Sequence, residues 1–399
     1  MNNQDLNILY VTSFCPHGPS FGARVRVLNI GRQLKRLGRV SLVISPMQDP
    51  DQESLDRSRE EFEIKHVAQV RPTHIKNPID RLRHELDPSY LNTFFSAVSE
   101  VDRVIMSQLI SEYDVVWIHT IRTANEFQIY RWPHAILDID DIPSRKYFSS
   151  AKVAHGFVRS LLDYRMSFIW RRRERLFKHR FDVFAVCSEL DRRYFRDIPR
   201  LHVIPNGFTT PSQVPKRVPS VPKRLGFIGL FQYVPNRTGI EWFIREVWPR
   251  IKHAAPDTRL RLVGVDSDKD LPNMGPDIDG LGFVKDTTEE IATWSAMIVP
   301  IRFGGGTRIK IAESFSLRCP VVSTKIGAFG YELHNGEEIL LADSAEDFGK
   351  ACIRIMNDQA LAERISENAW KKFLTNWTWD SIGESVKSAV QSCVIHSKR

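Results

Sequence analysis

Residues 300–315 read PIRFGGGTRIKIAESF, and three glycines in this segment join an apolar run to a helical pattern. The run at residues 296–301 is uniformly apolar, as expected of a buried strand. After the glycines, Ile309, Ala312 and Phe315 recur at helical spacing. A glycine loop that enters a helix offers backbone N–H groups and the positive end of the helix dipole to an anion. This corner therefore predicts an anion-binding turn at the end of a strand.

The charged side chains of this turn narrow the choice of ligand. Arg308 and Lys310 bring two mobile cations to it, and Glu313 follows about one turn into the helix. Cations and amides bind phosphate, whereas a carboxylate accepts hydrogen bonds from sugar hydroxyls. The combination favours a sugar–phosphate compound such as a nucleotide sugar. The alternative is a plain strand–turn–helix corner whose glycines only permit a tight backbone and whose cations face water.

The composition is that of a globular protein with room for two domains. The 399 residues are 42% hydrophobic and 26% charged, enough for two separate cores. No stretch approaches the roughly 18 to 20 apolar residues that span a bilayer. Residues 1–5 lack the basic segment of a secretory signal. We therefore expect a cytoplasmic protein.

The cysteines and the net charge further restrict the class of protein and the kind of partner. Five cysteines are widely spread without a C-x-x-C pair, which excludes a zinc ribbon and favours reduced, core-packed thiols. The net charge of +8 favours an anionic partner. By itself it leaves nucleic acid, anionic lipid and phosphorylated substrates open.

The first half of the chain alternates strands with helices. A predicted strand at residues 6–13 leads into a loop that contains Gly18 and Gly22, and apolar residues at helical spacing follow at 23–37. With the next strand at 40–45, this unit predicts a parallel sheet. The loop does not match the dinucleotide fingerprint G-x-G-x-x-G. Further on we expect a strand at 62–70 and mostly helix at 80–112.

His119 lies directly after a predicted buried strand at residues 114–118, and Asp140 and Asp141 follow another at 135–139. Catalytic and binding groups of open α/β sheets gather at the carboxyl ends of strands. His119 could therefore face a ligand. The alternative is that it only caps a loop.

The segment from Lys152 to Arg180 is basic and amphipathic. It carries nine Arg and Lys residues against two acidic ones, Asp163 and Glu174, with apolar residues interleaved. Such a helix can lie on anionic lipid headgroups. The alternative is a surface helix whose apolar face belongs to the core.

A proline-rich stretch divides the chain. Four prolines fall within residues 210–224 without a periodic apolar pattern, which indicates an extended linker. The strand–helix alternation then restarts, with strands expected at 224–229, 260–263, 281–284, 296–301 and 320–324. We expect an N-terminal domain at 1–209, a linker at 210–223, a second domain at 224–375 and a C-terminal helical segment at 376–399. Two parallel-sheet domains would face one another, with ligand in the cleft between them.

At this point the chain resembles the glycosyltransferases of the GT-B fold, specifically the retaining group called family 4 and its subgroup with a G-x-G-T-R-x-K donor loop. The resemblance covers most of the chain and is strongest after residue 205. It is carried by residues 186–189, 203–207, 227–229, 235–236, 260–264, 306–313 and 320–324. The fold it implies has two Rossmann-like domains and a C-terminal helix that returns to the first domain.

The resemblance also implies a donor site, mainly on the second domain. Glu313 would accept a hydrogen bond from the nucleotide ribose, and His119 would lie close to the transferred sugar. The implied donor-binding residues are Gly22, Gly229, Asn236, Arg237, Gly304, Gly305, Gly306, Thr307, Arg308, Lys310 and Glu313. The implied catalytic residues are His119, Arg308 and Lys310.

The implied reaction is retaining transfer of a sugar, of the hexosyltransferase type, from a nucleoside-diphosphate sugar to a hydroxyl of a glycan or lipid-linked acceptor. Arg308, Lys310 and the helix N-terminus would stabilise the leaving diphosphate. No cofactor or metal is expected. The Asp-x-Asp spacing of Asp138 and Asp140 falls in the first domain, where we expect a structural or acceptor-facing role. Gly305 stands where many members carry a glutamate that contacts the sugar, so the sugar is not implied.

Family habit places such an enzyme in cell-surface polysaccharide or glycolipid synthesis, with peripheral contact at the inner face of the membrane through Lys152 to Arg180. No nucleic-acid partner is expected, because the basic residues match no recognised reading motif. Two alternatives remain. One is a nucleotide-sugar epimerase of the same fold, and the other is a nucleotide-binding protein that has lost transfer through the change at Gly305.

Overall fold

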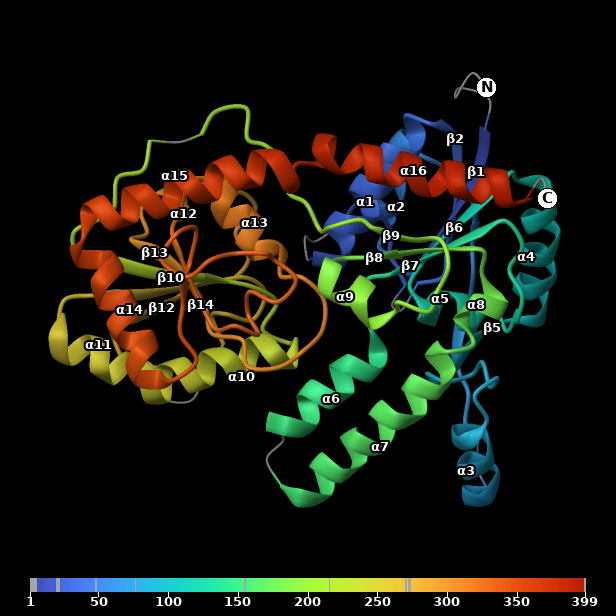
Figure 1. Ribbon diagram of the computed structural model, residues 1–399, viewed down its shortest axis with the longest axis horizontal. Coiled ribbons are helices and arrows are strands. Elements are labelled where there is room, and N and C mark those ends of the chain that lie inside the picture. Colours follow the sequence, from blue (N-terminus) through green and yellow to red (C-terminus); the bar gives the residue numbers. More distant parts are fainter. Residues whose placement is uncertain are drawn as a thin grey trace. The chain divides into compact units, whose positions relative to one another are not determined.

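The computed structural model describes residues 6–18, 22–46, 49–75, 77–153, 156–214, 216–269, 271 and 274–397 (Figure 1). The chain forms two compact units. One comprises Met1–Pro205 with Ile382–Arg399, and the other comprises Asn206–Ser381. Each contains a parallel sheet covered by helices, so the α/β alternation predicted from the sequence is confirmed.

The first unit is built on a seven-stranded parallel sheet in the order β3-β2-β1-β6-β7-β8-β9. The strands are β1 (Leu6–Thr12), β2 (Gly38–Ile44), β3 (Glu63–Val67), β6 (Val115–His119), β7 (Ala135–Ile139), β8 (Val183–Val186) and β9 (Leu201–Val203). The strand order reverses between β1 and β6. Open α/β sheets bind ligands at such a reversal, beside the carboxyl ends of the strands. His119, the last residue of β6, therefore lies at this switch point.

Helices and a small antiparallel pair surround this sheet. They are α1 (Gly22–Lys35), α2 (Gln52–Glu61), α3 (Pro78–Leu86), α4 (Glu100–Glu112), α5 (Ile121–Glu126), α6 (Pro143–Val153), α7 (Phe157–Glu174), α8 (Phe177–Arg180) and α9 (Glu189–Tyr194), with β4 (Val70–Pro72) paired to β5 (Ser96–Val98). Helices α6 and α7 form a hairpin that extends away from the sheet, as does α3 (Figure 1). No helix in the described part of the chain is long and apolar enough to cross a bilayer.

A buried ion pair ties α1 to the middle of the first sheet. Nε and Nη2 of Arg26 donate to the two carboxylate oxygens of Asp138 at 3.0 and 2.6 Å, and both side chains are fully buried. Nη1 donates to the carbonyl oxygen of Ile204 at 3.0 Å. Burial alone would lower the pKa of Arg26, but Asp138, Cys187 and Asp140 together more than offset this and raise it. Removing one partner of such a pair costs roughly 3–5 kcal/mol, so the pair fixes how α1, β7 and the end of the first unit meet.

The second unit repeats the design in a six-stranded parallel sheet of order β12-β11-β10-β13-β14-β15. Its strands are β10 (Arg224–Ile228), β11 (Arg259–Val263), β12 (Ile278–Gly280), β13 (Ala296–Val299), β14 (Val321–Ser323) and β15 (Leu340–Leu341). The strand order reverses between β10 and β13. A Cβ at Gly226 of β10 would lie 2.0 Å from the Trp294 ring, so glycine is required where this indole covers the sheet.

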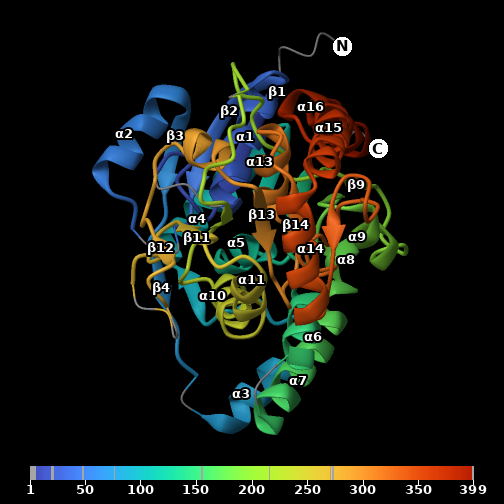
Figure 2. The same cartoon turned by 90° about the vertical axis from the view of Figure 1, so that its left-hand side faces the viewer.

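Helices cover both faces of the second sheet. In Figures 1 and 2, α13 and α15 lie on one face and α10 and α11 on the other. The helices are α10 (Val234–Trp242), a π-helical turn at Phe243–Val247, α11 (Trp248–Ala254), α12 (Thr288–Ala292), α13 (Ile309–Ser316), α14 (Ala345–Asn357) and α15 (Gln359–Asn376). The last helix, α16 (Trp379–Ser397), belongs to the first unit from Ile382 onward.

Three local predictions differ from the structure. The strand expected at 281–284 is β12 (Ile278–Gly280), which ends before Gly282 with its φ of 66°. The strand expected at 62–70 is divided into β3 and β4, and the segment 80–112 contains β5 between two helices. The proline-rich stretch lies within the second unit, where Val218 and Ser220 donate backbone hydrogen bonds to Ala292 and Thr293.

Candidate functional site

The loops after β10 and β13 meet at the switch point of the second sheet. The glycine loop follows β13, and two of its residues, Gly304 and Gly306, have φ angles of 122° and 67° that favour glycine. Helix α13 then begins at Ile309, and the preceding residue, Arg308, makes no side-chain cap. The N-terminal turn of α13 is therefore not blocked by a capping side chain, which leaves it suited to an anion.

Lys310 is held in a narrow space beside β10. Its Nζ donates to Asn236 Oδ1 at 3.0 Å and lies 3.7 Å from the centre of the Phe227 ring. A Cβ at Gly229 would lie 2.6 Å from Asn236 Nδ2 and 3.0 Å from Lys310 Nζ, so only glycine leaves room for this arrangement. Burial lowers the pKa of Lys310 well below its usual value, Arg308 lowers it further, and Glu313 opposes the shift.

The side chain of Arg308 is hydrogen-bonded to the backbone of its own loop. Its side chain is 8% exposed, and Nη1 donates to the carbonyl oxygens of Gly305 and Gly306. Its Nε and Nη2 are buried without a hydrogen-bond partner. The expectation of two mobile cations at this turn is therefore wrong, because both are fixed by packing. Within the described residues, neither Arg308 nor Lys310 forms an ion pair with a carboxylate.

Glu313 and Thr307 complete this corner. Glu313 Oε1 accepts a hydrogen bond from Thr287 Oγ1 at 2.9 Å, which engages one of its two oxygens. Burial raises the pKa of Glu313, while the Thr287 bond and the Lys310 charge lower it. Thr307 Oγ1 accepts from Asn206 Nδ2 at 2.9 Å. The corner thus contains two cations, a helix N-terminus and a carboxylate, as the sequence indicated.

Two further residues were implied for the donor site, Arg237 and Gly22. Arg237 donates to Glu241 on the same helix at 3.0 Å and is about half exposed, so its charge is compensated at the surface. Gly22 begins α1 in the first unit. The neighbouring loop residues 19–21, part of the predicted glycine loop, lie outside the described residues.

His119 is fully buried at the end of β6, and both of its ring nitrogens lack a hydrogen-bond partner. Its Nε2 lies 4.0 Å from the Asp140 carboxylate. Burial lowers the pKa of His119, although Asp138 and Asp140 oppose the shift, so the imidazole is neutral at pH 7. Among the described residues, only His119 and Arg308 leave two buried side-chain nitrogens unpaired. Such buried groups can form a hydrogen bond with a polar ligand or with a water molecule.

Asp138 has the structural role that was one of our two expectations. Both of its oxygens are bonded to Arg26, so it is not available to a metal ion. The sequence analysis missed Arg26 itself. The signal was present, because Arg26 stands four residues before Ile30 on the apolar face of the helix.

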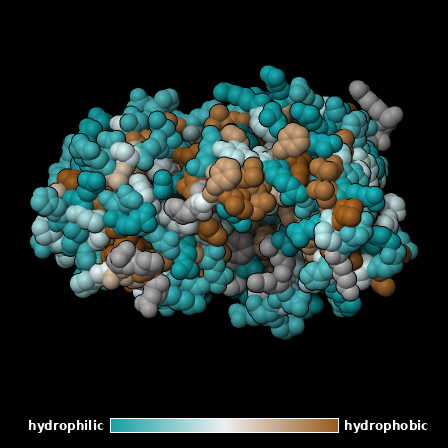
Figure 3. All heavy atoms as spheres, turned by 90° about the horizontal axis from the view of Figure 1, so that it is seen from below, coloured by the Kyte–Doolittle hydropathy of each residue, from teal (hydrophilic) through white to brown (hydrophobic). Residues whose placement is uncertain are grey.

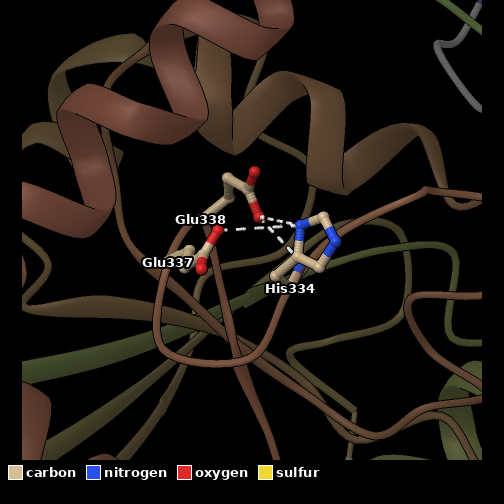
Figure 4. Close-up of side chains that lie close together, drawn as sticks. All are labelled: His334, Glu337 and Glu338. Carbon is tan, nitrogen blue, oxygen red and sulfur yellow. Dashed lines mark hydrogen bonds and ion pairs between the residues drawn. The ribbon is translucent and has the colours of Figure 1, made fainter.

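One cluster in the described ranges has side-chain atoms close enough to share a cation. It comprises His334, Glu337 and Glu338, on the segment between β14 and β15 (Figure 4). His334 and Glu337 are mostly exposed, and Glu338 accepts from Lys372 Nζ at 2.9 Å and from the His334 backbone N–H at 2.8 Å. Lys372 already compensates Glu338, so the cluster gives little reason to place an ion there.

Comparison with known sequences identifies part of the chain. Residues 222–358, which include the glycine corner, match the family model for glycosyl transferases group 1. A stretch of 170 residues is 22% identical to an uncharacterized 44.6 kDa protein in the cps region of Klebsiella pneumoniae. That match spans 40% of this chain and 44% of the relative's length.

Solved structures resemble nearly the whole chain in fold, at low sequence identity. Sucrose-phosphate synthase from Thermosynechococcus elongatus has a TM-score of 0.64 at 16% identity, over 95% of this chain and 96% of that one. HepE from Anabaena in complex with UDP has a TM-score of 0.66 at 15% identity, over 97% and 100%. A glycosyltransferase from Rickettsia africae has a TM-score of 0.64 at 14% identity, over 98% of each chain. The chain therefore has the GT-B fold, and its residues 222–358 match the family model for glycosyl transferases group 1.

Proposed function

We propose that the protein is a retaining glycosyltransferase that moves a sugar from a nucleoside-diphosphate sugar to a hydroxyl of a glycan or lipid-linked acceptor. The group 1 domain and the GT-B fold support glycosyl transfer. The observation that carries the rest is a pair of cations beside the N-terminus of α13, the buried Arg308 and the part-buried Lys310. Within the described residues, neither is paired with a carboxylate. A diphosphate would neutralise both, and a ribose hydroxyl would donate to Glu313.

The proposed chemistry uses this positive charge to stabilise the leaving group. The bond from the anomeric carbon to the diphosphate oxygen breaks, and its electron pair stays on that oxygen beside Arg308 and Lys310. The acceptor oxygen bonds to the anomeric carbon from the same face, and its proton passes to the departing phosphate. For His119, neutral and unpaired, we propose a hydrogen bond to a hydroxyl of the transferred sugar.

The same residues support a reaction without a metal. A divalent ion in phosphate chemistry neutralises charge on the leaving oxygens. Here two cations and a helix N-terminus can supply positive charge to those oxygens.

UDP is the first donor nucleotide to try, because the HepE structure was solved with it. The relative in a cps region supports a role in surface polysaccharide synthesis.

Helix α7 supports peripheral contact with an anionic membrane. Its exposed apolar residues include Phe157, Val158, Leu161 and Phe168, and Phe157 is 82% exposed. Figure 3 shows apolar side chains gathered on this face of the unit. Exposed Arg171 and Arg172 lie on the same helix, whereas Arg173 is buried and belongs to no surface patch. We propose that α7 places its apolar residues among lipid headgroups.

Lys310→Met should weaken nucleotide binding about tenfold or more, because it removes the charge but keeps a side chain that can pack on Phe227. The measurement is a calorimetric titration with UDP, GDP, ADP and CMP in the presence of EDTA. The matched control is Lys350→Met, which removes an exposed lysine from α14 and should leave affinity unchanged. Wild-type affinity in Lys310→Met would contradict the diphosphate site.

The nucleotide affinity measured in this titration should depend on pH. Burial depresses the pKa of Lys310 in the free protein, and a bound diphosphate raises it. Binding therefore takes up a proton, and affinity should fall as the pH rises above the lowered pKa of the free protein.

His119→Leu should leave the free energy of unfolding within about 1 kcal/mol of wild type, because the imidazole has no hydrogen bond to lose. It should slow sugar transfer about tenfold or more. The control is His66→Leu, since His66 Nε2 lies 2.5 Å from Asp102 Oδ1. That variant should lose about 1–3 kcal/mol of stability and keep its transfer rate. The opposite pattern, an unstable His119→Leu with normal transfer, would assign His119 a structural role.

Phe157→Ser with Leu161→Ser should reduce sedimentation with phosphatidylglycerol vesicles, because it removes apolar area from α7. The control double variant is Val101→Ser with Ile395→Ser, two equally exposed apolar residues on other helices of the first unit. Equal sedimentation of wild type and the α7 variant would reject membrane contact through α7.

A further inference from the structure

A cavity of about 300 Å³ lies in the first unit, bordered by α3, α6, α7 and the segment 90–95. It is lined by apolar, aromatic and charged side chains. Neither the proposed sugar transfer nor the glycine corner uses it. Its charged lining consists of four arginines and two carboxylates, namely Arg81, Arg159, Arg165, Arg173, Glu85 and Asp163.

The two carboxylates are already engaged by three of these arginines. Glu85 is paired with Arg81 at 3.5 Å and with Arg165. Asp163 is paired with Arg159 at 3.5 Å and also accepts from Ser150. The cavity therefore carries excess positive charge, and acidic side chains in its lining do not neutralise it.

Arg173 is the fourth arginine and the most buried, at 5% exposure. Its Nη2 donates to the carbonyl oxygens of His84 and Glu85 at 3.1 and 3.3 Å, and its Nε is buried without a partner. Within the described residues it forms no ion pair. Burial lowers the pKa of Arg173, but a guanidinium stays charged at any ordinary pH. Arg173 lines the cavity as a buried cation without an ion pair, so an anion bound in the cavity would offset part of the free-energy cost of burying its charge.

Exposed apolar side chains lie on two of the helices that border the cavity. On α3 these are Ile79, Leu82 and Leu86, and on α7 they are Leu161, Leu162 and Phe168. Leu162 connects the two regions, because it lines the cavity and is still 46% exposed. Soluble proteins rarely expose so many neighbouring apolar residues without a partner. An occupant with a phosphate at one end and hydrocarbon at the other matches both features.

We propose that this cavity binds the phosphate of a membrane lipid, whose hydrocarbon chain lies along the exposed apolar residues of α3 and α7. A single guanidinium can bind a phosphate through two parallel hydrogen bonds, which fits the excess of arginines in the cavity. The inference deepens the proposed function, on which its biological meaning rests. It names the acceptor class as a lipid whose phosphate joins the hydrocarbon to the part that receives the sugar.

The test is a titration of the full-length protein with dodecyl phosphate below its micelle concentration. Wild type should bind one molecule saturably. Arg81→Gln with Arg165→Gln should weaken binding about tenfold or more, because both arginines line the cavity near its exposed edge. Leu162→Trp should do the same by filling the cavity without changing charge. It tests the site independently if the arginine variant folds poorly.

Three controls decide whether the cavity is the site. Arg171→Gln with Arg172→Gln removes two exposed arginines from the same helix and should keep wild-type affinity. Dodecyl maltoside, with the same chain and a neutral headgroup, and inorganic phosphate, without a chain, should each bind at least about tenfold more weakly. Equal loss in both arginine pairs, or equal binding of dodecyl maltoside, would overturn the proposal by reducing it to surface attraction.

The test of the lipid-phosphate cavity can be distinguished from the test of the proposed donor site. The cavity variants should bind UDP as wild type does, because they change nothing near Lys310. Dodecyl phosphate binding without nucleotide binding would keep this inference and remove the proposed transfer. Nucleotide binding with no specific dodecyl phosphate binding would do the reverse.

Discussion

A cation held away from water without a neighbouring carboxylate costs free energy until an anion binds beside it. The buried Arg26 shows how this chain removes that cost where no ligand is needed, because the Asp138 carboxylate neutralises its charge. In the described part of the chain, Arg308 donates only to carbonyl oxygens of its own loop, and Lys310 donates to the neutral side-chain amide of Asn236. We infer that a bound anion would supply the missing negative charge, and the proposed donor site depends on this inference.

The positions of these cations follow from the sheet. Lys310 on α13 reaches the end of β10 because Gly229 leaves room for its amine beside Asn236. The loops that follow β10 and β13 meet only because the strand order reverses there. Charge that is fixed before the ligand arrives needs no reorganisation during reaction, which is how electrostatic catalysis is most effective. The first sheet places His119 at the corresponding reversal.

The sequence predicted those features of the fold that depend on a local pattern of residues. The apolar runs and the glycine loop in the sequence predicted the positions of β13, α13 and the glycine corner between them, because each of these features depends on residues that are neighbours in the sequence. It could not predict interactions that folding alone brings together. Arg26 and Asp138 are 112 residues apart, and the cavity needs α3 beside α7. The basic run from Arg171 to Arg173 looked uniform, yet helical rotation turns Arg173 inward and leaves its neighbours exposed.

Amide hydrogen exchange with and without UDP tests the central claim most directly, because it reports where the nucleotide lies. If the diphosphate occupies the N-terminus of α13, exchange should slow in residues 304–311, at Gly229 after β10 and at Asn236 in the first turn of α10. Peptides from α3 and α7 should be unaffected. Saturating UDP that protects other segments and leaves the glycine corner unchanged would contradict the account.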